Sequence, residues 1–565
     1  MNHRAPPHRA PFARSMAECS APVALAAASL CALASLTACG GDDGGTPATP
    51  AVTAQSQCEA LARQALPLTT LTVAYNAAGA ASAAGVTLPA HCQIDGATNA
   101  RTGVDGHSYA IGFRLRMPDT WNGRFLFMGG GGNDGNVGNA IGSNVGAPGS
   151  MTPALLNGYA VVGTDGGHTG GSGADFATDP LARVDHAYNA YDKTAVNAKS
   201  LIAALYGRAP DKSYFVGCSG GGRQGMMFTQ RFPNYFDGVI AMAPAMRVSS
   251  GATIAAMWNN LQFTDIAPVE SGSPILSKAY SKADIALVSS SIVAQCDALD
   301  GAADGMVNNF QACHYDPVVL QCSGAKTASC LSAAQVTALQ KVFTGPTNSA
   351  GRSLYVGQVT DPGIDQPGWA AWTLGSSTTA TPNSAYNTLM ADALRWEFFT
   401  PSDPTFQALS FDFDTDPVRM VAESSIYDTY ADEMLAGYKA HGGKLMFVHG
   451  LADPIFSAHD TVDYYERLAA NSGGMAATQA FARVFLVPGE NHCGGGRATD
   501  QFDALTSMVN WVEKGTAPDS IAAAAAATST VFPGRTRPLC PYPQFAKYNG
   551  TGSIEDAANF SCATQ

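Results

Sequence analysis

The stretch SYFVGCSGGGRQGMMFTQRF at 213–232 constrains the fold most, because it predicts a strand, a glycine-rich turn and a helix in succession. Its first residues are typical of a buried strand, and its last ten are typical of a helix. Between them Ser219 lies among small residues in a G-x-S-x-G pattern, which a sharp and strained strand-to-helix turn requires. Such a turn lifts the hydroxyl clear of the sheet, beside a helix N-terminus that favours developing negative charge. Ser219 is therefore a candidate nucleophile.

The same alternation of strand and helix patterns recurs in two separate parts of the chain. The pattern predicts strands at 124–130, 159–167, 213–221, 444–450 and 482–489, and helices at 194–207, 223–232, 429–441, 461–470 and 502–515. Alternation of this kind favours an α/β class fold with a doubly wound sheet.

The alternation breaks between about 246 and 430, where irregular polar stretches hold four of the six tryptophans. We interpret 246–430 as an inserted lid domain between two parts of the core, 58–245 and 431–565. The alanine run at 522–527 is expected to be a loop or a short helix.

The N-terminus has the features of an export signal rather than of a folded element. Three arginines precede an apolar run, which ends in Leu36-Thr37-Ala38-Cys39 followed by GGDDGG. This resembles a bacterial lipoprotein signal over 1–38, with cleavage before Cys39 and lipidation of its thiol, and a plain secretory signal is the alternative. Residues 39–57 lack large apolar side chains and are predicted to form a flexible tether. We expect an exported protein, anchored to the outer membrane or free in the periplasm or medium, that touches a membrane only through this lipid.

The charge of the chain limits which partners it can bind, and its cysteine content indicates the compartment in which it folds. Removing 1–38 takes away three Arg and one Glu and moves the formal charge from −13 to −15. Nucleic acid is therefore not expected as a partner, because its binding requires basic surface. Of thirteen cysteines, three lie in the signal or at the anchor, and the remaining ten suggest five disulfides in an oxidising compartment.

Two residues after late strands complete a candidate catalytic triad. Asp453 follows the strand at 444–450, and His492 follows the strand at 482–489. The order Ser, Asp, His, with the acid and base beyond late strands, is that of an α/β-hydrolase. An N-cap role for Asp453 and a plain loop role for His492 are the alternatives. The other histidines considered, at 168, 449 and 459, lie too early or on the acid strand itself.

Two further features fit this triad. The oxyanion of an ester intermediate needs two backbone N–H groups, and we assign them to Gly220 and to the glycine loop that ends at Gly132, for which a structural turn is the alternative. Cys218 precedes the serine and Cys493 follows the histidine. Because the triad must bring these two sites together, we predict a disulfide between them; a Cys218 nucleophile is disfavoured because Ser219 occupies the apex of the turn.

The chain resembles the tannase/feruloyl esterase family of α/β-hydrolases over roughly 58–562. The motifs that carry the resemblance are 102–125, 163–168, 211–227, 296–307, 411–417, 464–468, 485–496 and 536–544. The resemblance implies hydrolysis of aromatic acid esters by the triad, Gly132 and Gly220 in the oxyanion hole, and an aromatic wall of Trp372 and Phe456. It also implies the pairs Cys58–Cys92, Cys218–Cys493, Cys296–Cys313, Cys322–Cys330 and Cys540–Cys562.

The motif CDALDGAADGMV predicts a cation site in the inserted segment. It supplies Asp297, Asp300 and Asp304 with glycines for tight turns, a pattern of hard oxygen ligands that suits calcium without the EF-hand spacing. The family resemblance adds the backbone carbonyls of Ala302 and Met306. We expect a structural Ca²⁺, and a solvated acidic turn is the alternative.

Two departures bear on the substrate. In the branch of the family that hydrolyses mono(2-hydroxyethyl) terephthalate, a glutamate follows the nucleophile and a lid arginine pairs with the free carboxylate. This chain has Gly220 at the first position and no arginine over 376–394, although Arg395 lies just beyond. Esters of terephthalic, ferulic and gallic acids thus compete as substrates. A serine peptidase of the same fold and a binding lipoprotein with a dead site are further alternatives.

Overall fold

The computed structural model describes residues 53–143 and 152–565, so the predicted signal over 1–38 and Cys39 lie outside the described residues. Its centre is a nine-stranded sheet with the strand order β1-β4-β5-β7-β6-β8-β9-β12-β13. The strands are β1 (Thr69–Asn76), β4 (His91–Thr102), β5 (Ser108–Pro118), β6 (Arg124–Met128), β7 (Ala160–Thr164), β8 (Lys212–Cys218), β9 (Gly238–Met242), β12 (Lys444–Gly450) and β13 (Ala482–Val487).

The sheet is parallel from β7 to β13 and antiparallel at its other edge. Strands β7, β6, β8, β9, β12 and β13 pair in parallel, and every residue of β7 and β9 is buried, as is typical of strands covered on both faces. The pairs β1–β4, β4–β5 and β5–β7 are antiparallel. The α/β sheet is thus present, and its antiparallel edge was not read from the sequence.

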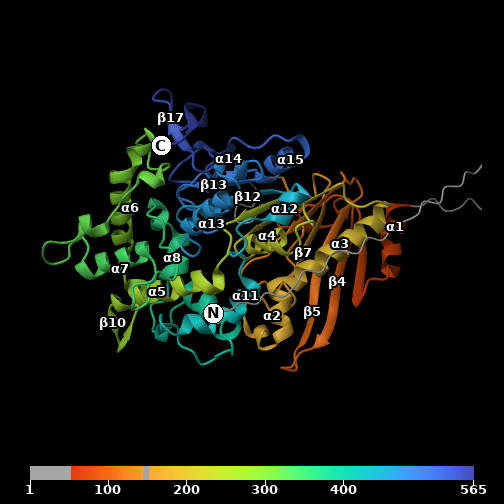
Figure 1. The fold of residues 1–565 in the computed structure, drawn as a ribbon, viewed down its shortest axis with the longest axis horizontal. Coiled ribbons are helices and arrows are strands. Elements are labelled where there is room, and N and C mark those ends of the chain that lie inside the picture. Colours follow the sequence, from red (N-terminus) through yellow and green to blue (C-terminus); the bar gives the residue numbers. More distant parts are fainter. Residues whose placement is uncertain (1–52, 144–151) are drawn as a thin grey trace, which may run out of the picture. The chain divides into compact units, whose positions relative to one another are not determined.

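Helices cover both faces of this sheet (Figure 1). The helices of the core are α1 (Ala54–Ala60), α2 (Pro180–Val184), α3 (Ala190–Tyr206), α4 (Gly220–Arg231), α12 (Ala436–His441), α13 (Ala458–Asn471), α14 (Met475–Gln479) and α15 (Ala504–Lys514). Alternate residues of a strand point to opposite faces. Phe215 of β8 packs in a cluster with α3, α4 and α13, whereas its neighbours Tyr214 and Val216 pack in another with α15.

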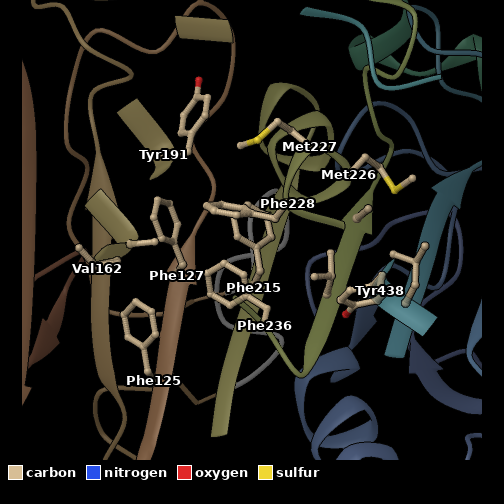
Figure 2. Packing of buried hydrophobic residues seen from close by; sticks show 14 of the residues in the cluster. Phe125, Phe127, Val162, Tyr191, Phe215, Met226, Met227, Phe228, Phe236 and Tyr438 are labelled. Atoms are coloured by element: carbon tan, nitrogen blue, oxygen red, sulfur yellow. The ribbon is translucent and has the colours of Figure 1, made fainter. Parts of the chain in front are cut away.

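Aromatic packing fixes helix α4, which follows the candidate nucleophile, against the strands beneath it. Figure 2 shows Phe127 and Phe215 of the sheet facing Phe228 of α4. The ring centroid of Phe228 lies 5.5 Å from that of Phe127 and 5.5 Å from that of Phe215. It lies 4.7 Å from the ring centroid of Phe236. Such aromatic pairs stabilise beyond their buried area, by about 0.5–1.5 kcal/mol each. These contacts therefore hold the helix that follows Ser219 against the sheet.

The inserted segment, 246–430, contributes no strand to the nine-stranded sheet in the part of the chain that the structure describes. Helices α5 to α8 of this segment lie at the left of Figure 1, and strands β4 and β5 lie at its right. Its elements are α5 (Thr253–Asp265), β10 (Val269–Glu270), β11 (Ser273–Pro274), α6 (Lys282–Cys296), α7 (Ala333–Thr344), α8 (Pro367–Thr373), α9 (Ala391–Ala393), α10 (Asp416–Arg419) and α11 (Val421–Tyr427). A lid function for it stays a prediction.

Buried polar and ionisable groups attach the inserted segment to the core. Glu397, fully buried, contacts His186 Nδ1 at 2.7 Å, and Glu423 lies 3.6 Å from Arg183. Burial raises the pKa of both carboxyls, and Glu397 raises that of Glu423 further. The guanidinium of Arg223 on α4 lies over the ring of Tyr427 at 3.7 Å. The helix behind the candidate nucleophile and the inserted segment therefore share one buried polar cluster.

Three local expectations are wrong over part of their range. In the alanine run, β15 (Ile521–Ala524) is a strand, because it pairs with both β14 (Gln501–Phe502) and β16 (Thr536–Leu539) and tertiary pairing overrides helix propensity. Residues 525–527 form the expected loop. The helix expected over 429–441 begins only at Ala436, since Asp432 Oδ1 accepts the N–H groups of Met434 and Leu435 in a competing turn.

The third concerns the tether, whose last residues are already folded. Helix α1 begins at Ala54 inside the expected tether, because Thr53 and Ser56 form a capping box and Cys58 is bonded to Cys92. The remaining short strands are β2 (Ser82–Ala83), β3 (Val86–Thr87), β17 (Phe545–Tyr548) and β18 (Phe560–Ala563).

All five cysteine pairs that the sequence led us to expect are bonded in the structure. They are Cys58–Cys92, Cys218–Cys493, Cys296–Cys313, Cys322–Cys330 and Cys540–Cys562. Five disulfides are typical of a protein that folds in an oxidising compartment outside the cytoplasm. Among the described residues, no helix combines the length and the apolar character that crossing a membrane requires.

Candidate active site

Ser219 lies at the tight turn between β8 and α4, as its sequence pattern predicts. Its backbone adopts φ +64° and ψ −124° as the residue that precedes α4, a conformation that costs energy for a residue with a side chain. The surrounding backbone holds it there, because its N–H donates to Met242 O at 3.0 Å and its carbonyl accepts from Ala245 N at 3.1 Å. A Cβ at Gly221 would lie 2.5 Å from Gly130 O. The turn therefore requires glycine where the sequence has it.

Asp453 lies beyond β12 and is 2% exposed. Its Oδ1 accepts the N–H groups of Ile455 and Phe456 at 2.9 and 3.0 Å, and its Oδ2 lies 2.7 Å from His492 Nδ1. The N-cap alternative is wrong, because Ser457 caps α13. Burial raises the pKa of Asp453, but the neighbouring His492 and His449 outweigh burial and the net pKa is lowered. Asp453 is thus an ionised carboxylate against the imidazole.

His492 lies beyond β13 and joins the acid to the serine turn. With Nδ1 on Asp453, its Nε2 faces Cys493, whose Sγ is 3.6 Å away. Cys493 is bonded to Cys218, with their Cα atoms 6.0 Å apart. The loop that carries the candidate base is therefore covalently joined to the residue before Ser219, which explains the cysteine beside the serine.

The three rival histidines considered from the sequence, His168, His449 and His459, do not take the place of His492. His449 is fully buried behind the acid, with Nδ1 on Thr461 Oγ1 at 2.8 Å and Nε2 on Phe456 O at 2.7 Å. His168 contacts Asn133 O at 2.7 Å, and burial lowers its pKa to about 4. His459 lies on α13, and burial lowers its pKa. The side chain of His449 still affects the site, since it lies 3.5 Å from Asp453 Oδ2.

The glycine loop and the nucleophile turn meet where the oxyanion hole was predicted. Gly132 has φ +59°, and its carbonyl lies 3.1 Å from where a Cβ of Gly220 would be. Among the described residues, no group accepts a hydrogen bond from the N–H of Gly132 or Gly220. Two free N–H groups beside a nucleophile are what an oxyanion requires.

A support for this loop escaped the sequence reasoning. Gln224 of α4 accepts the N–H of Gly130 at 3.1 Å and donates to Asp134 Oδ2 at 3.0 Å. Asp134 is buried and lies two residues after Gly132. In the sequence, the only hint of this role was that Gln224 lies in the helix that follows the serine. The contact between Gln224 and the glycine loop depends on the tertiary fold.

The two aromatic residues assigned to the substrate wall both lie against the imidazole. The ring centroid of Trp372, on α8, is 5.0 Å from that of His492, and that of Phe456 is 5.3 Å from it. Arg395 points elsewhere, because its Nε donates to Phe406 O at 2.8 Å. In the described part of the chain, Arg395 makes no other side-chain hydrogen bond or ion pair. Trp372 of the inserted segment and Phe456 of the core therefore lie beside the candidate base, and their role as a substrate wall stays a prediction.

The acidic loop has the ligand types that calcium prefers. Burial raises the pKa of Asp300 and Asp297, the nearby charge of Asp304 also raises both, and the resulting pKa of Asp300 is about 6. Such crowding of carboxylates favours a cation between them. The carbonyl oxygens of Ala302 and Met306 accept no hydrogen bond from any described residue.

Local donors nevertheless share these carboxylates. Asp300 accepts from Asn308 Nδ2 at 2.6 Å, Asp297 accepts from Gly305 N at 3.0 Å, and Asp304 pairs with Arg537. Within residues 53–143 and 152–565, no three His, Cys, Asp or Glu side chains are arranged to hold a metal ion. Calcium here stays a prediction.

Comparisons with known proteins agree with this geometry. The profile of the family described as "Tannase and feruloyl esterase" matches residues 92–563. The chain is 43% identical over 538 residues to mono(2-hydroxyethyl) terephthalate hydrolase of Piscinibacter sakaiensis, covering 87% of each chain. It is 30% identical over 479 residues to a probable feruloyl esterase of Arthroderma benhamiae, covering 80% and 81%. The crystal structure of feruloyl esterase B from Aspergillus oryzae matches with a TM-score of 0.76 and 26% identity, over 90% of this chain and all of the other. The chain belongs to the tannase and feruloyl esterase family.

Proposed function

We propose that this protein is a serine carboxylic ester hydrolase that acts on esters of aromatic acids. The observation that carries the proposal is the buried Asp453–His492 contact of 2.7 Å, whose imidazole faces the disulfide next to Ser219. Family membership supports ester chemistry.

The reaction follows from the roles that each group can take. His492 Nε2 removes the proton from Ser219 Oγ as the oxygen attacks the ester carbonyl, and Asp453 holds the Nδ1–H tautomer and stabilises the imidazolium. The N–H groups of Gly132 and Gly220 stabilise the oxyanion. The imidazolium then protonates the leaving alcohol, and a water molecule activated by His492 releases the aromatic acid and restores the serine.

For the substrate we propose a monoester of an aromatic dicarboxylic acid, of the type of mono(2-hydroxyethyl) terephthalate, cleaved to terephthalate and ethylene glycol. The 43% identity to a hydrolase of that ester supports it, as does the aromatic wall of Trp372 and Phe456 against His492. A planar aromatic ring can stack against these two side chains.

Plant phenolic esters, the substrates of feruloyl esterases and tannases, are the second candidate. Two observations favour them. Residues 376–394 hold no arginine for a free carboxylate, and Arg395 is directed to Phe406 O. A neutral phenolic ring needs no such partner.

Steady-state kinetics on mono(2-hydroxyethyl) terephthalate, its neutral bis(2-hydroxyethyl) ester, methyl ferulate and methyl gallate test both candidates. We expect turnover of at least one ester by the wild type and its loss in Ser219→Ala. The highest kcat/KM identifies the acyl group. A folded Ser219→Ala protein that keeps a tenth of the activity would contradict the mechanism, and preference for aryl amides would indicate a peptidase.

We further propose a structural Ca²⁺ held by Asp297, Asp300, Asp304 and the carbonyls of Ala302 and Met306, and a lipid anchor on Cys39. The crowded carboxylates support the first, and the sequence LTAC before GGDDGG supports the second. Calcium titration followed by calorimetry tests the ion, and mass spectrometry of the exported protein tests the lipid.

A further inference from the structure

The amide of Asn491, directly before His492, joins three segments of the site. The side chain is 2% exposed, and its Nδ2 donates to Gly363 O at 3.0 Å and to Ala452 O at 3.3 Å. Ala452 directly precedes Asp453, and Gly363 belongs to the inserted segment. One amide therefore connects the loop of the base, the loop of the acid and the inserted segment.

These three segments approach too closely for side chains between them. A Cβ at Gly363 would lie 2.6 Å from both Ala452 Cβ and Gly489 O, and a Cβ at Gly368 would lie 2.6 Å from Asn491 Oδ1. In the described residues Asn491 Oδ1 accepts no hydrogen bond. The amide is therefore oriented by its two donated bonds alone, with its oxygen toward the backbone at Gly368.

A second buried side chain ties the inserted segment to the same loop. Asp361 is 1% exposed, its Oδ1 accepts the N–H of Gly363 at 2.7 Å, and its Oδ2 accepts that of Gly489 at 3.1 Å. Charge-assisted hydrogen bonds of this kind are stronger than neutral ones. Asp361 thus fixes Gly363 in the position from which it accepts the Asn491 amide.

The stretch from Asp361 to Gly363 leads directly into helix α8, which carries Trp372. Helix α8 begins at Pro367 and holds Trp372, whose ring lies 5.0 Å from that of His492. We propose that Asn491 is a positioning residue that couples the placement of Trp372 to the alignment of His492 with Asp453. This inference rests on the proposed ester hydrolysis and extends it to a group that touches no reacting atom.

Asn491→Ala tests the coupling, with an aromatic ester such as methyl ferulate as substrate. Removing the amide leaves the carbonyl of Ala452 without a donor and leaves Gly363 O with the Gln366 N–H as its remaining donor. The base loop is thereby loosened, and a misplacement of about 1 Å costs on the order of 10² in rate. We expect kcat to fall by about 10² with KM changed less than about threefold, because a misaligned base affects the chemical step more than ground-state binding.

A double-mutant cycle with Trp372→Ala measures whether the two residues act together in catalysis, which a purely structural role of Asn491 would not produce. If Asn491 acts through the placement of Trp372, the double variant should lose at least about fivefold less activity than the product of the two single losses. Asp361→Asn, which keeps the side-chain volume, provides a second variant should Asn491→Ala fail to fold, and we expect about a tenfold loss of kcat.

Asn197→Ala is the matched control. This asparagine is also buried, and its Nδ2 donates to Thr98 Oγ1 at 2.9 Å on the far strands of the sheet, so the variant should lose melting temperature while kcat stays within about twofold. The proposal is overturned if folded Asn491→Ala keeps kcat within threefold of wild type, or if its loss simply multiplies with that of Trp372→Ala. Failure of the proposed function is separate, because it would appear as activity retained by Ser219→Ala.

Discussion

Replacing both Cys218 and Cys493 by alanine should lower stability and catalysis together. The bond closes a loop with a sequence separation of 275 residues, for which the chain-entropy relation gives about 5.6 kcal/mol at 25 °C. An unfolding entropy of about 2 cal/mol/K per residue over roughly 500 residues converts this into a melting temperature lower by about 5 °C. Because Cys493 adjoins His492 and Cys218 adjoins Ser219, release of the two loops should also lower kcat by on the order of 10².

Differential scanning calorimetry and steady-state hydrolysis of one aromatic ester measure the two effects on the same sample. The pair Cys58→Ala/Cys92→Ala is the control, because its bond spans 34 residues at the far edge of the sheet, and the same relation gives about 3.8 kcal/mol. The control should lose melting temperature but keep kcat within about twofold. A Cys218→Ala/Cys493→Ala enzyme with unchanged kcat would refute the reasoning that this bond aligns the nucleophile with the base.

Four other outcomes are expected. Ser219→Ala and His492→Ala should each lower kcat by about 10⁶, with little further loss when combined, whereas Asp453→Asn should cost about 10⁴ in the same assay. Removing calcium with EDTA should lower the melting temperature, and added calcium should restore it; a melting temperature that ignores both would leave the acidic loop a solvated turn. The ratio of kcat/KM for mono(2-hydroxyethyl) terephthalate over its neutral bis ester should stay within about tenfold, because no arginine lies over 376–394, and a ratio above about 10³ would contradict this. Burial raises the pKa of Glu397 and Glu423 in the folded state, so above about pH 4.5 the folded protein holds protons that the unfolded chain releases. The free energy of unfolding, measured in denaturant, should therefore fall as pH rises above that value. The Glu423→Gln variant should show a weaker dependence on pH.

Much of the sheet could be predicted from the sequence because its central strands are short apolar runs separated by amphipathic helices. The runs at 213–216 and 444–450 became β8 and β12, since strands buried on both faces must be continuously apolar. The antiparallel strands β4 and β5 were missed, although the alternating burial along β5 is the pattern that predicts a half-buried strand.

The sequence by itself determined the order of the triad and the need for glycine around Ser219. A strand followed by G-x-S-x-G permits one local geometry, and an acid and a histidine beyond later parallel strands must arrive at the same edge of the sheet. The predicted disulfide between Cys218 and Cys493 followed from that same constraint.

Only the tertiary structure decided which residues support the triad. Gln224 reaches the glycine loop from α4, and Asn491 reaches Gly363 across 128 residues of chain. Neither contact has a local signature, because a hydrogen bond between distant segments depends on where the fold places both partners. The same reason explains the strand at Ile521–Ala524, whose alanines favour a helix in isolation and pair as a strand between two neighbours. Local pattern thus fixes elements and strained turns, whereas long-range packing selects the contacts that align them.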